Sequence, residues 1–179
     1  MGDEIFTLWQ VLLRKALKMP ATLLLVLGEG GHSQEMLRLA ELLGPIYRYC
    51  YILVRDDELS AAKIRRPGPT YRVIRPRDKK HNLFFDALKA VLCGLQALVI
   101  LLRCRPDAII ASGPGVAGPV CVAAKVMRRK VIFVETGSRV HALSKTGRII
   151  YSFADLFFVQ WPQLLPHYPR AIYAGRIWS

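Results

Sequence analysis

Short apolar segments that end near glycine recur along this chain of 179 residues and alternate with segments of helical character. The first spans residues 21–27 and leads directly into Gly28-Glu-Gly-Gly-His32. A continuous apolar run of this length is typical of a strand buried on both faces of a parallel sheet. Because the helical segments lie between the strands, the pattern predicts βαβ units. The sequence therefore favours an α/β fold: a Rossmann-like parallel sheet with helices on both faces.

The predicted elements alternate between strand and helix over most of the chain. We expect strands at 21–27, 49–54, 70–74, 107–111, 130–134, 155–160 and 171–173, and helices at 33–43, 83–104, 119–127 and 140–153. Right-handed crossovers would bring the carboxyl ends of all strands to one edge of the sheet, where open α/β sheets bind ligands. Loops that contain glycine leave the strands at that edge at three places: 28–31, 113–118 and 136–138.

The loop Gly28-Glu-Gly-Gly-His-Ser33 joins a predicted strand to a predicted helix. Glycine lets the backbone approach a ligand closely, and the N–H groups at a helix N-terminus suit phosphate. The loop is not the dinucleotide fingerprint GxGxxG, because Ser33 occupies the last glycine position, and no Gly-Lys-Ser/Thr of a Walker loop follows. It is either a tight turn with Ser33 as N-cap, or a site in which His32 binds a diphosphate or takes a proton.

Two further features belong to the same predicted edge. The loop Ser112-Gly-Pro-Gly-Val-Ala-Gly118 follows a strand, so it and the first glycine loop could line one crevice. Glu135 follows the strand at 130–134 directly, and we expect its carboxylate to project into this crevice. Glu135 is either an acid at a helix start, stabilised by the helix dipole, or a carboxylate that binds a sugar hydroxyl or acts as a general base.

The chain is strongly basic, with 26 Lys and Arg against 13 Asp and Glu and a net charge of +13. Such a charge favours a polyanionic partner: nucleic acid, an anionic membrane or a phosphorylated ligand. Eight of the basic residues lie at 63–81, where Tyr71 is the one aromatic side chain. Stacking on single-stranded bases is therefore poorly supported, and this tract is either a solvated loop or a site for phosphate or anionic lipid.

Residues 5–18 place apolar side chains at helical spacing, with basic residues towards the end. The segment is shorter than the roughly 20 residues that cross a bilayer. It either packs on the core or forms, as residues 1–19, an amphipathic helix on an anionic membrane. In the second case we expect membrane contacts from Ile5, Leu8, Trp9, Leu12, Arg14 and Lys15.

A second apolar stretch runs over residues 83–102 and includes Asp86 and Lys89. Each charge near the bilayer centre costs about 2.5–3.5 kcal/mol, so we expect no transmembrane helix here. The segment 90–102 is either a core helix or a helix with one face in the membrane. The four cysteines form no CxxC pair, which predicts neither a zinc site nor a disulfide framework and favours a reducing, cytosolic compartment.

Five motifs occur in order along the chain: Leu-Gly-Glu-Gly-Gly-His-Ser-Gln-Glu-Met at 27–36, Ala-Ser-Gly-Pro-Gly at 111–115, Val-Glu-Thr-Gly-Ser-Arg-Val at 134–140, Phe-Phe-Val-Gln-Trp-Pro at 157–162 and Tyr-Ala-Gly-Arg-Ile at 173–177. Together they resemble the membrane-anchor subunit of the two-subunit UDP-GlcNAc transferase of dolichol-linked oligosaccharide synthesis, and its bacterial relatives in capsule and exopolysaccharide assembly. The resemblance covers residues 21–177. It implies that residues 20–179 are equivalent to the N-terminal, acceptor-side half of a MurG-like GT-B glycosyltransferase.

The resemblance also implies an activity. A sugar would pass, with inversion and without a metal or other cofactor, from a UDP-sugar (UDP-GlcNAc or a related UDP-hexose or UDP-glucuronate) to a polyprenyl-diphosphate-linked acceptor. A separate subunit would bind the UDP-sugar, and this chain would recruit it peripherally to the cytoplasmic face of the cell membrane, or to the cytosolic side of the endoplasmic reticulum in a eukaryote. By the resemblance, Gly30, Gly31 and His32 match the family's glycine loop that meets the acceptor's diphosphate, Glu135 matches its acidic strand end, and Gly113 and Gly115 match its second loop. We expect catalysis from His32 and Glu135. We expect the acceptor or its diphosphate to be bound by Gly28, Gly30, Gly31, Ser33, Ser112, Gly113, Gly115, Thr136 and Gly137.

Two other functions stay open at this point. The chain could be a scaffold that only anchors its partner at the membrane, without any part in catalysis. It could also be a basic module that binds nucleic acid, although we expect no nucleic-acid partner. Binding to liposomes and to duplex DNA at matched salt separates these classes, because every basic protein binds polyanions when the salt concentration is low.

Overall fold

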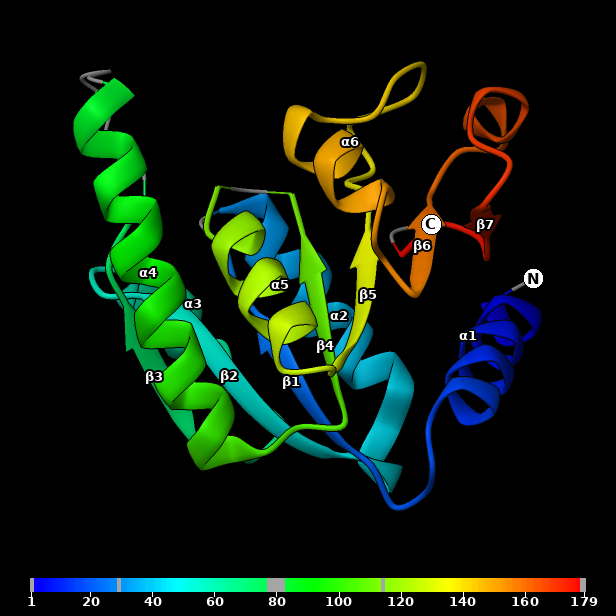
Figure 1. Cartoon of the computed structure of the whole chain (residues 1–179). Coiled ribbons are helices and arrows are strands. Elements are labelled where there is room, and N and C mark those ends of the chain that lie inside the picture. The colour runs from blue at the N-terminus through cyan, green and yellow to red at the C-terminus, as the bar shows by residue number, and fades with distance from the viewer. Residues whose placement is uncertain (1, 29, 77–82, 114, 178–179) are drawn as a thin grey trace.

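The structure is a computed structural model that describes residues 2–28, 30–76, 83–113 and 115–177, without the side chains of 2–7 and 83. Its centre is a seven-stranded sheet with the order β3-β2-β1-β4-β5-β6-β7, in which every pair of neighbours is parallel (Figure 1). The strands are β1 (Thr22–Val26), β2 (Arg48–Val54), β3 (Thr70–Val73), β4 (Ala108–Ser112), β5 (Lys130–Val134), β6 (Leu156–Val159) and β7 (Ala171–Tyr173). The predicted Rossmann-like parallel sheet is confirmed.

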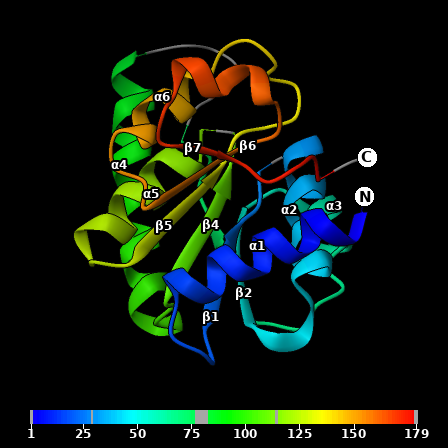
Figure 2. The same cartoon turned by 90° about the vertical axis from the view of Figure 1, so that its right-hand side faces the viewer.

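Helices cover both faces of this sheet. They are α1 (Gly2–Ala16), α2 (Gly31–Leu43), α3 (Glu58–Ala61), α4 (Leu83–Cys104), α5 (Ala117–Val126) and α6 (Lys145–Tyr151), with short 3-10 helices at Gly44–Ile46 and Pro162–His167. Two cores follow from this arrangement, because alternate strand residues point to opposite faces. Leu24 and Val26 pack with α4, α5 and α6, whereas Leu23 and Leu25 pack with α1 and α2 (Figures 1 and 2).

The strand order reverses direction between β1 and β4. The chain moves outwards from β1 to β2 and β3, and then returns to β4 on the other side of β1. Such a switch point leaves an open crevice at the carboxyl ends of the two central strands, since their following segments turn to opposite faces. The loops after β1 and β4 are two of the three glycine loops that the sequence singles out.

Three helices begin at other residues than predicted, and one of them, α5, begins at Ala117, two residues earlier than expected. Helix α2 begins at Gly31 with Gly30 as its N-cap, so the interpretation of Ser33 as the N-cap is wrong. Helix α6 begins at Lys145, five residues later than expected, because the Ser144 side chain accepts a hydrogen bond from the N–H of Gly147 and caps the helix there. The preceding residues 136–144 are therefore free to form a loop at the edge where ligands bind.

Helix α1 packs with one face on the sheet (Figure 2). Trp9 is 3% exposed and stacks on Phe158 of β6, with ring centroids 3.8 Å apart, and Leu13 is fully buried. The expected membrane contact of Trp9 is thus wrong, because the apolar face that would meet lipid meets the core instead. Leu8, Arg14 and Lys15 are exposed and Leu12 is half-buried, whereas the Ile5 side chain lies outside the described residues.

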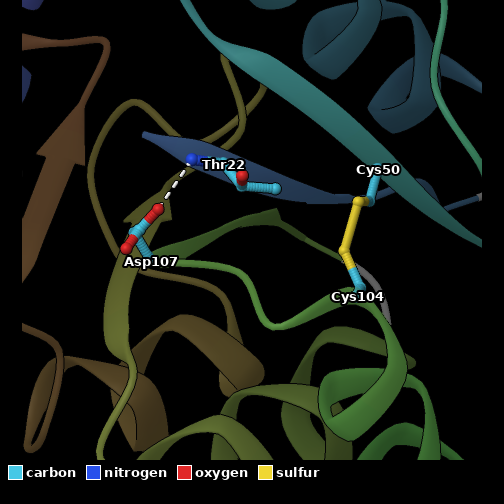
Figure 3. The surroundings of a disulfide bond; sticks show 4 residues. All are labelled: Thr22, Cys50, Cys104 and Asp107. Carbon is cyan, nitrogen blue, oxygen red and sulfur yellow. Dashed lines mark hydrogen bonds between the residues drawn. A yellow bond between two sulfur atoms is a disulfide. The ribbon is translucent and has the colours of Figure 1, made fainter. Parts of the chain in front are cut away.

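A disulfide joins Cys50 of β2 to Cys104, the last residue of α4 (Figure 3). The expectation that the cysteines form no disulfide is wrong for this pair. The two residues are 54 positions apart in sequence, but α4 runs back along the sheet and ends beside the first half of β2. The same view shows the start of β1 and β4, where Asp107 accepts a hydrogen bond from the N–H of Thr22 at 2.8 Å.

Candidate functional site

His32 and Gly113 are in contact at the switch point of the sheet. His32 belongs to the first turn of α2, and Gly113 is the first residue after β4. A Cβ atom on Gly113 would overlap the His32 ring, and the φ of +51° at Gly113 is one that side chains disfavour. Glycine at this position therefore lets the imidazole lie directly on the backbone that follows β4. The structure thus brings together the first two glycine loops, as the sequence predicts.

His32 is half-buried, and its surroundings favour the neutral imidazole. Burial lowers the pKa of His32 below 6.5, the positive charge of Arg139 lowers it further, and the negative charge of Glu35 raises it. Its Nδ1 atom is buried and has no hydrogen-bond partner among the described residues. A neutral imidazole at neutral pH has a nitrogen that can accept a proton.

Glu35 lies one turn after His32 on α2 and is 6% exposed. Its Oε1 atom accepts hydrogen bonds from the N–H of Gly137 at 2.9 Å, from Thr136 Oγ1 at 3.3 Å and from Gln160 Nε2 at 3.3 Å. Its Oε2 atom accepts a bond from Ser112 Oγ at 3.4 Å. One buried carboxylate therefore ties α2 to the end of β4 and to the segments that follow β5 and β6.

Gln160 extends this network to the end of the described chain. Its Nε2 atom also donates to the carbonyl of Glu135 at 3.1 Å, and its Oε1 atom accepts from the N–H of Ile177 at 3.0 Å. The next residue, Trp161, donates from Nε1 to the carbonyl of Gly137 at 2.7 Å, and the Arg176 guanidinium lies over its ring. The motifs at 157–162 and 173–177 thus hold the loop after β5 in place.

Glu135 does not project into the crevice, so this expectation is wrong. Its side chain is fully buried and turns towards the start of α6. One carboxylate oxygen accepts from the N–H of Thr136 at 3.1 Å, and the other accepts from Ser144 N at 2.9 Å and Ser144 Oγ at 3.1 Å. Burial raises the pKa of Glu135 above 4.5, although these hydrogen bonds and Arg139 oppose the shift. This geometry shapes the loop at 136–144, and a catalytic role for Glu135 stays a prediction.

The other residues expected to bind the acceptor surround the same place. Gly28 is buried at the end of β1, Gly30 has a φ of +65°, and Gly31 is exposed at the start of α2. Ser112, Thr136 and Gly137 are held by Glu35, whereas Ser33 is buried on the other side of the first turn. Gly115 is exposed near Pro76. In the parts of the chain that the structure describes, no group of three His, Cys, Asp or Glu side chains is placed to hold a metal ion.

Glu35, Gln160 and Arg139 are the residues of the site that sequence reasoning missed. All three stand inside motifs that carry the resemblance, at 27–36, 157–162 and 134–140. A polar residue directly after a buried strand, such as Gln160 after β6, signals a position at the ligand-binding edge. Glu35 gave no such signal, because an acid in the middle of a helix is normally solvated.

The sequence profile of the family described as "Oligosaccharide biosynthesis protein Alg14 like" matches residues 23–177. The chain belongs to this family. It is 34% identical over 179 residues to the Mus musculus protein named "UDP-N-acetylglucosamine transferase subunit ALG14", covering 87% of this chain and 82% of that protein. The Homo sapiens protein of the same name is 33% identical over 178 residues, with the same coverage of both chains. The Alg14 resemblance drawn from the five motifs is confirmed.

The fold of this Alg14-family chain is similar to that of MurG from Acinetobacter baumannii. The TM-score is 0.68 at 17% sequence identity, and the match covers 80% of this chain but 43% of MurG. The chain thus spans less than half the length of the MurG structure that it matches. The predicted equivalence to the N-terminal Rossmann-like domain of a GT-B glycosyltransferase is confirmed.

Proposed function

We propose that this chain is the acceptor-side subunit of a heteromeric, inverting glycosyltransferase. The enzyme transfers a sugar from UDP-N-acetylglucosamine, or from a related UDP-hexose or UDP-glucuronate, to a polyprenyl-diphosphate-linked acceptor. The observation that carries this proposal is the contact of His32 with Gly113 at the switch point of the sheet, in a chain of the Alg14 family. The names of the mouse and human relatives support the reaction class and the role as a subunit.

A second subunit supplies the UDP-sugar site in this proposal. The match to 43% of MurG supports it, because the chain corresponds to one of the two halves between which a GT-B enzyme works. The isolated chain then has an acceptor site but no donor site. We therefore infer that it transfers no sugar until the partner subunit binds and closes the cleft above the carboxyl edge of the sheet.

The diphosphate of the acceptor fits the first turn of α2. The N-cap residue is Gly30, which makes no side-chain hydrogen bond to the helix. Among the described residues no side chain caps this turn, so its backbone N–H groups, including those of Gly31 and His32, can bind a ligand, and the helix dipole favours an anion there. Arg139 adds positive charge near His32. Gly115 is exposed, so a phosphate can approach the second loop there.

His32 is the proposed proton acceptor in the reaction. The acceptor hydroxyl gives its proton to His32 as its oxygen attacks the anomeric carbon of the donor sugar, and the bond between that carbon and the UDP oxygen breaks, so that UDP leaves. A neutral imidazole is needed for this step, and the lowered pKa of His32 keeps the ring neutral at the pH of the cytosol. Glu35 holds the surrounding loops in place from one turn further along α2.

We propose that the chain attaches peripherally to the cytoplasmic face of the membrane through α4. Phe84–Cys104 is long and apolar enough to cross a membrane by length and composition, with a mean hydropathy of 2.0. One side of the helix is covered, however, since Cys93, Ala97 and Leu101 are buried against the domain. The other side exposes eight large apolar side chains, which we call the α4 stripe: Phe84, Phe85, Leu88, Val91, Leu92, Leu95, Val99 and Leu102.

The position of the α4 stripe suits a lipid-linked substrate. Helix α4 begins at the same edge of the sheet as the glycine loops (Figure 1). An apolar stripe on the outside of a helix, unlike a buried span, favours a helix that lies in the membrane interface. A polyprenyl chain held in the bilayer would thus place its diphosphate near the first turn of α2. The basic residues Arg77, Lys79 and Lys80, expected to meet lipid headgroups, lie outside the described residues.

The test is reconstitution with the donor-binding subunit in liposomes that contain a polyprenyl-diphosphate-linked acceptor. We expect transfer by the complex, none by the chain alone, and a drop in kcat of about a hundredfold or more in His32→Ala. A complex in which His32→Ala keeps full kcat and KM would make the chain a scaffold. A higher acceptor KM with unchanged kcat would instead make His32 a diphosphate ligand. Turnover by the isolated chain would contradict the two-subunit enzyme.

A further inference from the structure

A pocket of about 390 Å³ lies beside the first turn of α2, on the side that faces β2. It is lined by Gly30 and Ser33 on one side, and on the other by Asp56, Asp57, Leu59 and Lys63 from the segment after β2. β1 and β2 are neighbouring parallel strands, so the segments that follow them meet at the ligand-binding edge.

Two residues that line the pocket each have an oxygen atom without a hydrogen-bond partner among the described residues. They are Ser33, which is 2% exposed and has no partner at Oγ, and Asp57, which is 9% exposed and has none at Oδ2. Burying such atoms unbonded destabilises a fold. The structural role of Asp57 uses its other oxygen: Oδ1 accepts a hydrogen bond from the N–H of Ser60 at 3.0 Å and caps α3. In the part of the chain that the structure describes, no hydrogen bond uses Ser33 Oγ or Asp57 Oδ2.

The chemistry of the lining groups favours a hydroxylated ring over a phosphate. A carboxylate oxygen only accepts hydrogen bonds, a serine hydroxyl accepts and donates, and the Lys63 ammonium donates. Asp56 and Asp57 both carry negative charge, which disfavours a second anion at this place. Leu59 is 78% exposed and offers an apolar surface at the rim. A sugar matches both properties of the pocket, because its hydroxyls donate and accept hydrogen bonds at the edge of the ring and its C–H face is apolar.

We propose that this pocket binds the sugar ring of the lipid-linked acceptor, with ring hydroxyls hydrogen-bonded to Asp57 Oδ2 and Ser33 Oγ. The inference rests on the proposed function, which places the acceptor diphosphate at the first turn of α2. Ser33, expected to bind the acceptor or its diphosphate, then binds the sugar of the acceptor, and the pocket determines which acceptor is used.

Titration calorimetry with two probes tests the proposal on the full chain in detergent micelles. The probes are a short-chain polyprenyl diphosphate, either bare or carrying one N-acetylglucosamine. Asp57→Asn keeps the cap on α3, because asparagine Oδ1 also accepts the Ser60 N–H, but it replaces Oδ2 by a donor. We expect its Kd for the sugar-bearing probe to rise about tenfold or more, and that of Ser33→Ala to rise about threefold to tenfold. Neither variant should change the Kd of the bare probe by more than about twofold.

The controls separate this proposal from the one on which it rests. Ser152→Ala and Asp107→Asn remove comparable groups far from the pocket, and should bind both probes like the wild type. Ser33→Ala should keep or raise the Tm, because the lost hydroxyl has no partner among the described residues. If wild type binds neither probe, the proposed function fails. If it binds both probes and the two pocket variants bind them with wild-type affinity, the proposed function stands and the sugar pocket is refuted.

Discussion

The imidazole of His32 rests on the backbone of Gly113, so the first turn of α2 and the loop after β4 touch at the switch point of the sheet. Each residue constrains the other. The ring occupies the space that a Cβ atom on Gly113 would need, and the loop conformation at Gly113, with φ at +51°, is strained for any other residue. The contact fixes where the ring lies relative to the backbone N–H groups in the first turn of α2.

Gly113→Ala should therefore displace the His32 ring and lower the turnover of the reconstituted complex at least tenfold. The left-handed conformation should also reduce the free energy of unfolding by about 1–3 kcal/mol. Gly118→Ala is the matched control: a Cβ there meets nothing within 4 Å and φ is not positive. Thermal denaturation and sugar transfer, measured on both variants, check the prediction. Equal turnover in the two variants would show that the contact between His32 and Gly113 does not affect sugar transfer.

The two charged neighbours of His32 should shift its pKa in opposite directions. Glu35→Gln removes the negative charge that raises this pKa, so the value should fall further below 6.5, whereas Arg139→Gln removes a positive charge and should raise it. NMR titration of the imidazole in each folded variant measures both shifts. If His32 is the base, the acid limb of the pH–rate profile should move with the measured pKa. Shifts of the same sign in both variants would contradict the charge arrangement.

The lowered pKa of His32 also predicts how stability depends on pH. Below pH 6.5 the unfolded chain takes up a proton at this residue that the folded chain resists, so the contribution of His32 favours unfolding as the pH falls towards its folded pKa. Chemical denaturation of wild type and His32→Gln at pH 5 to 8 isolates this contribution. The wild type should lose more stability than the variant as the pH drops from 7 to 5. Parallel curves would mean that burial does not perturb the imidazole.

Glu135→Gln should act mainly on stability. The carboxylate accepts three hydrogen bonds, and an amide leaves at least one donor of Thr136 or Ser144 without a partner, a loss of about 1–3 kcal/mol. Ser144→Ala is the companion variant, because it removes the cap of α6 and leaves the carboxylate in place, and it should cost about 1 kcal/mol. Urea denaturation measures both losses. An unchanged midpoint together with lost turnover in Glu135→Gln would restore the catalytic interpretation.

Much of the fold follows from local sequence signals. The strands are continuous apolar runs because both faces of the sheet are covered. Gly113 can be recognised as a site residue because it directly follows a predicted strand. Long-range pairings leave no such signal. Cys50 and Cys104 meet only because α4 returns along the sheet, and Glu35 looks like a solvated helix position until the segments after three strands close over it.

The apolar spacing in α1 illustrates a different limit. The positions of Trp9 and Leu13 suit a membrane surface and a protein core equally, since both need one apolar face. The sequence does not say that Phe158, almost 150 residues away, completes the packing of Trp9. For the same reason, the sequence of α4 suits a core helix and a helix with one face in the membrane. In the structure one side of α4 is buried and the other is exposed.

Membrane attachment should depend on α4 and not on α1. Leu95→Glu places a charge in the middle of the α4 stripe, whereas Leu8→Glu places the same charge on an exposed position of α1. Burying a leucine side chain contributes about 1.5–3 kcal/mol, so Leu95→Glu should weaken co-sedimentation with anionic liposomes about tenfold or more, and Leu8→Glu should leave it within about twofold. High salt should reduce wild-type binding without abolishing it, because screening removes only the charge contribution. The reverse order of the two variants would assign the membrane contact to α1.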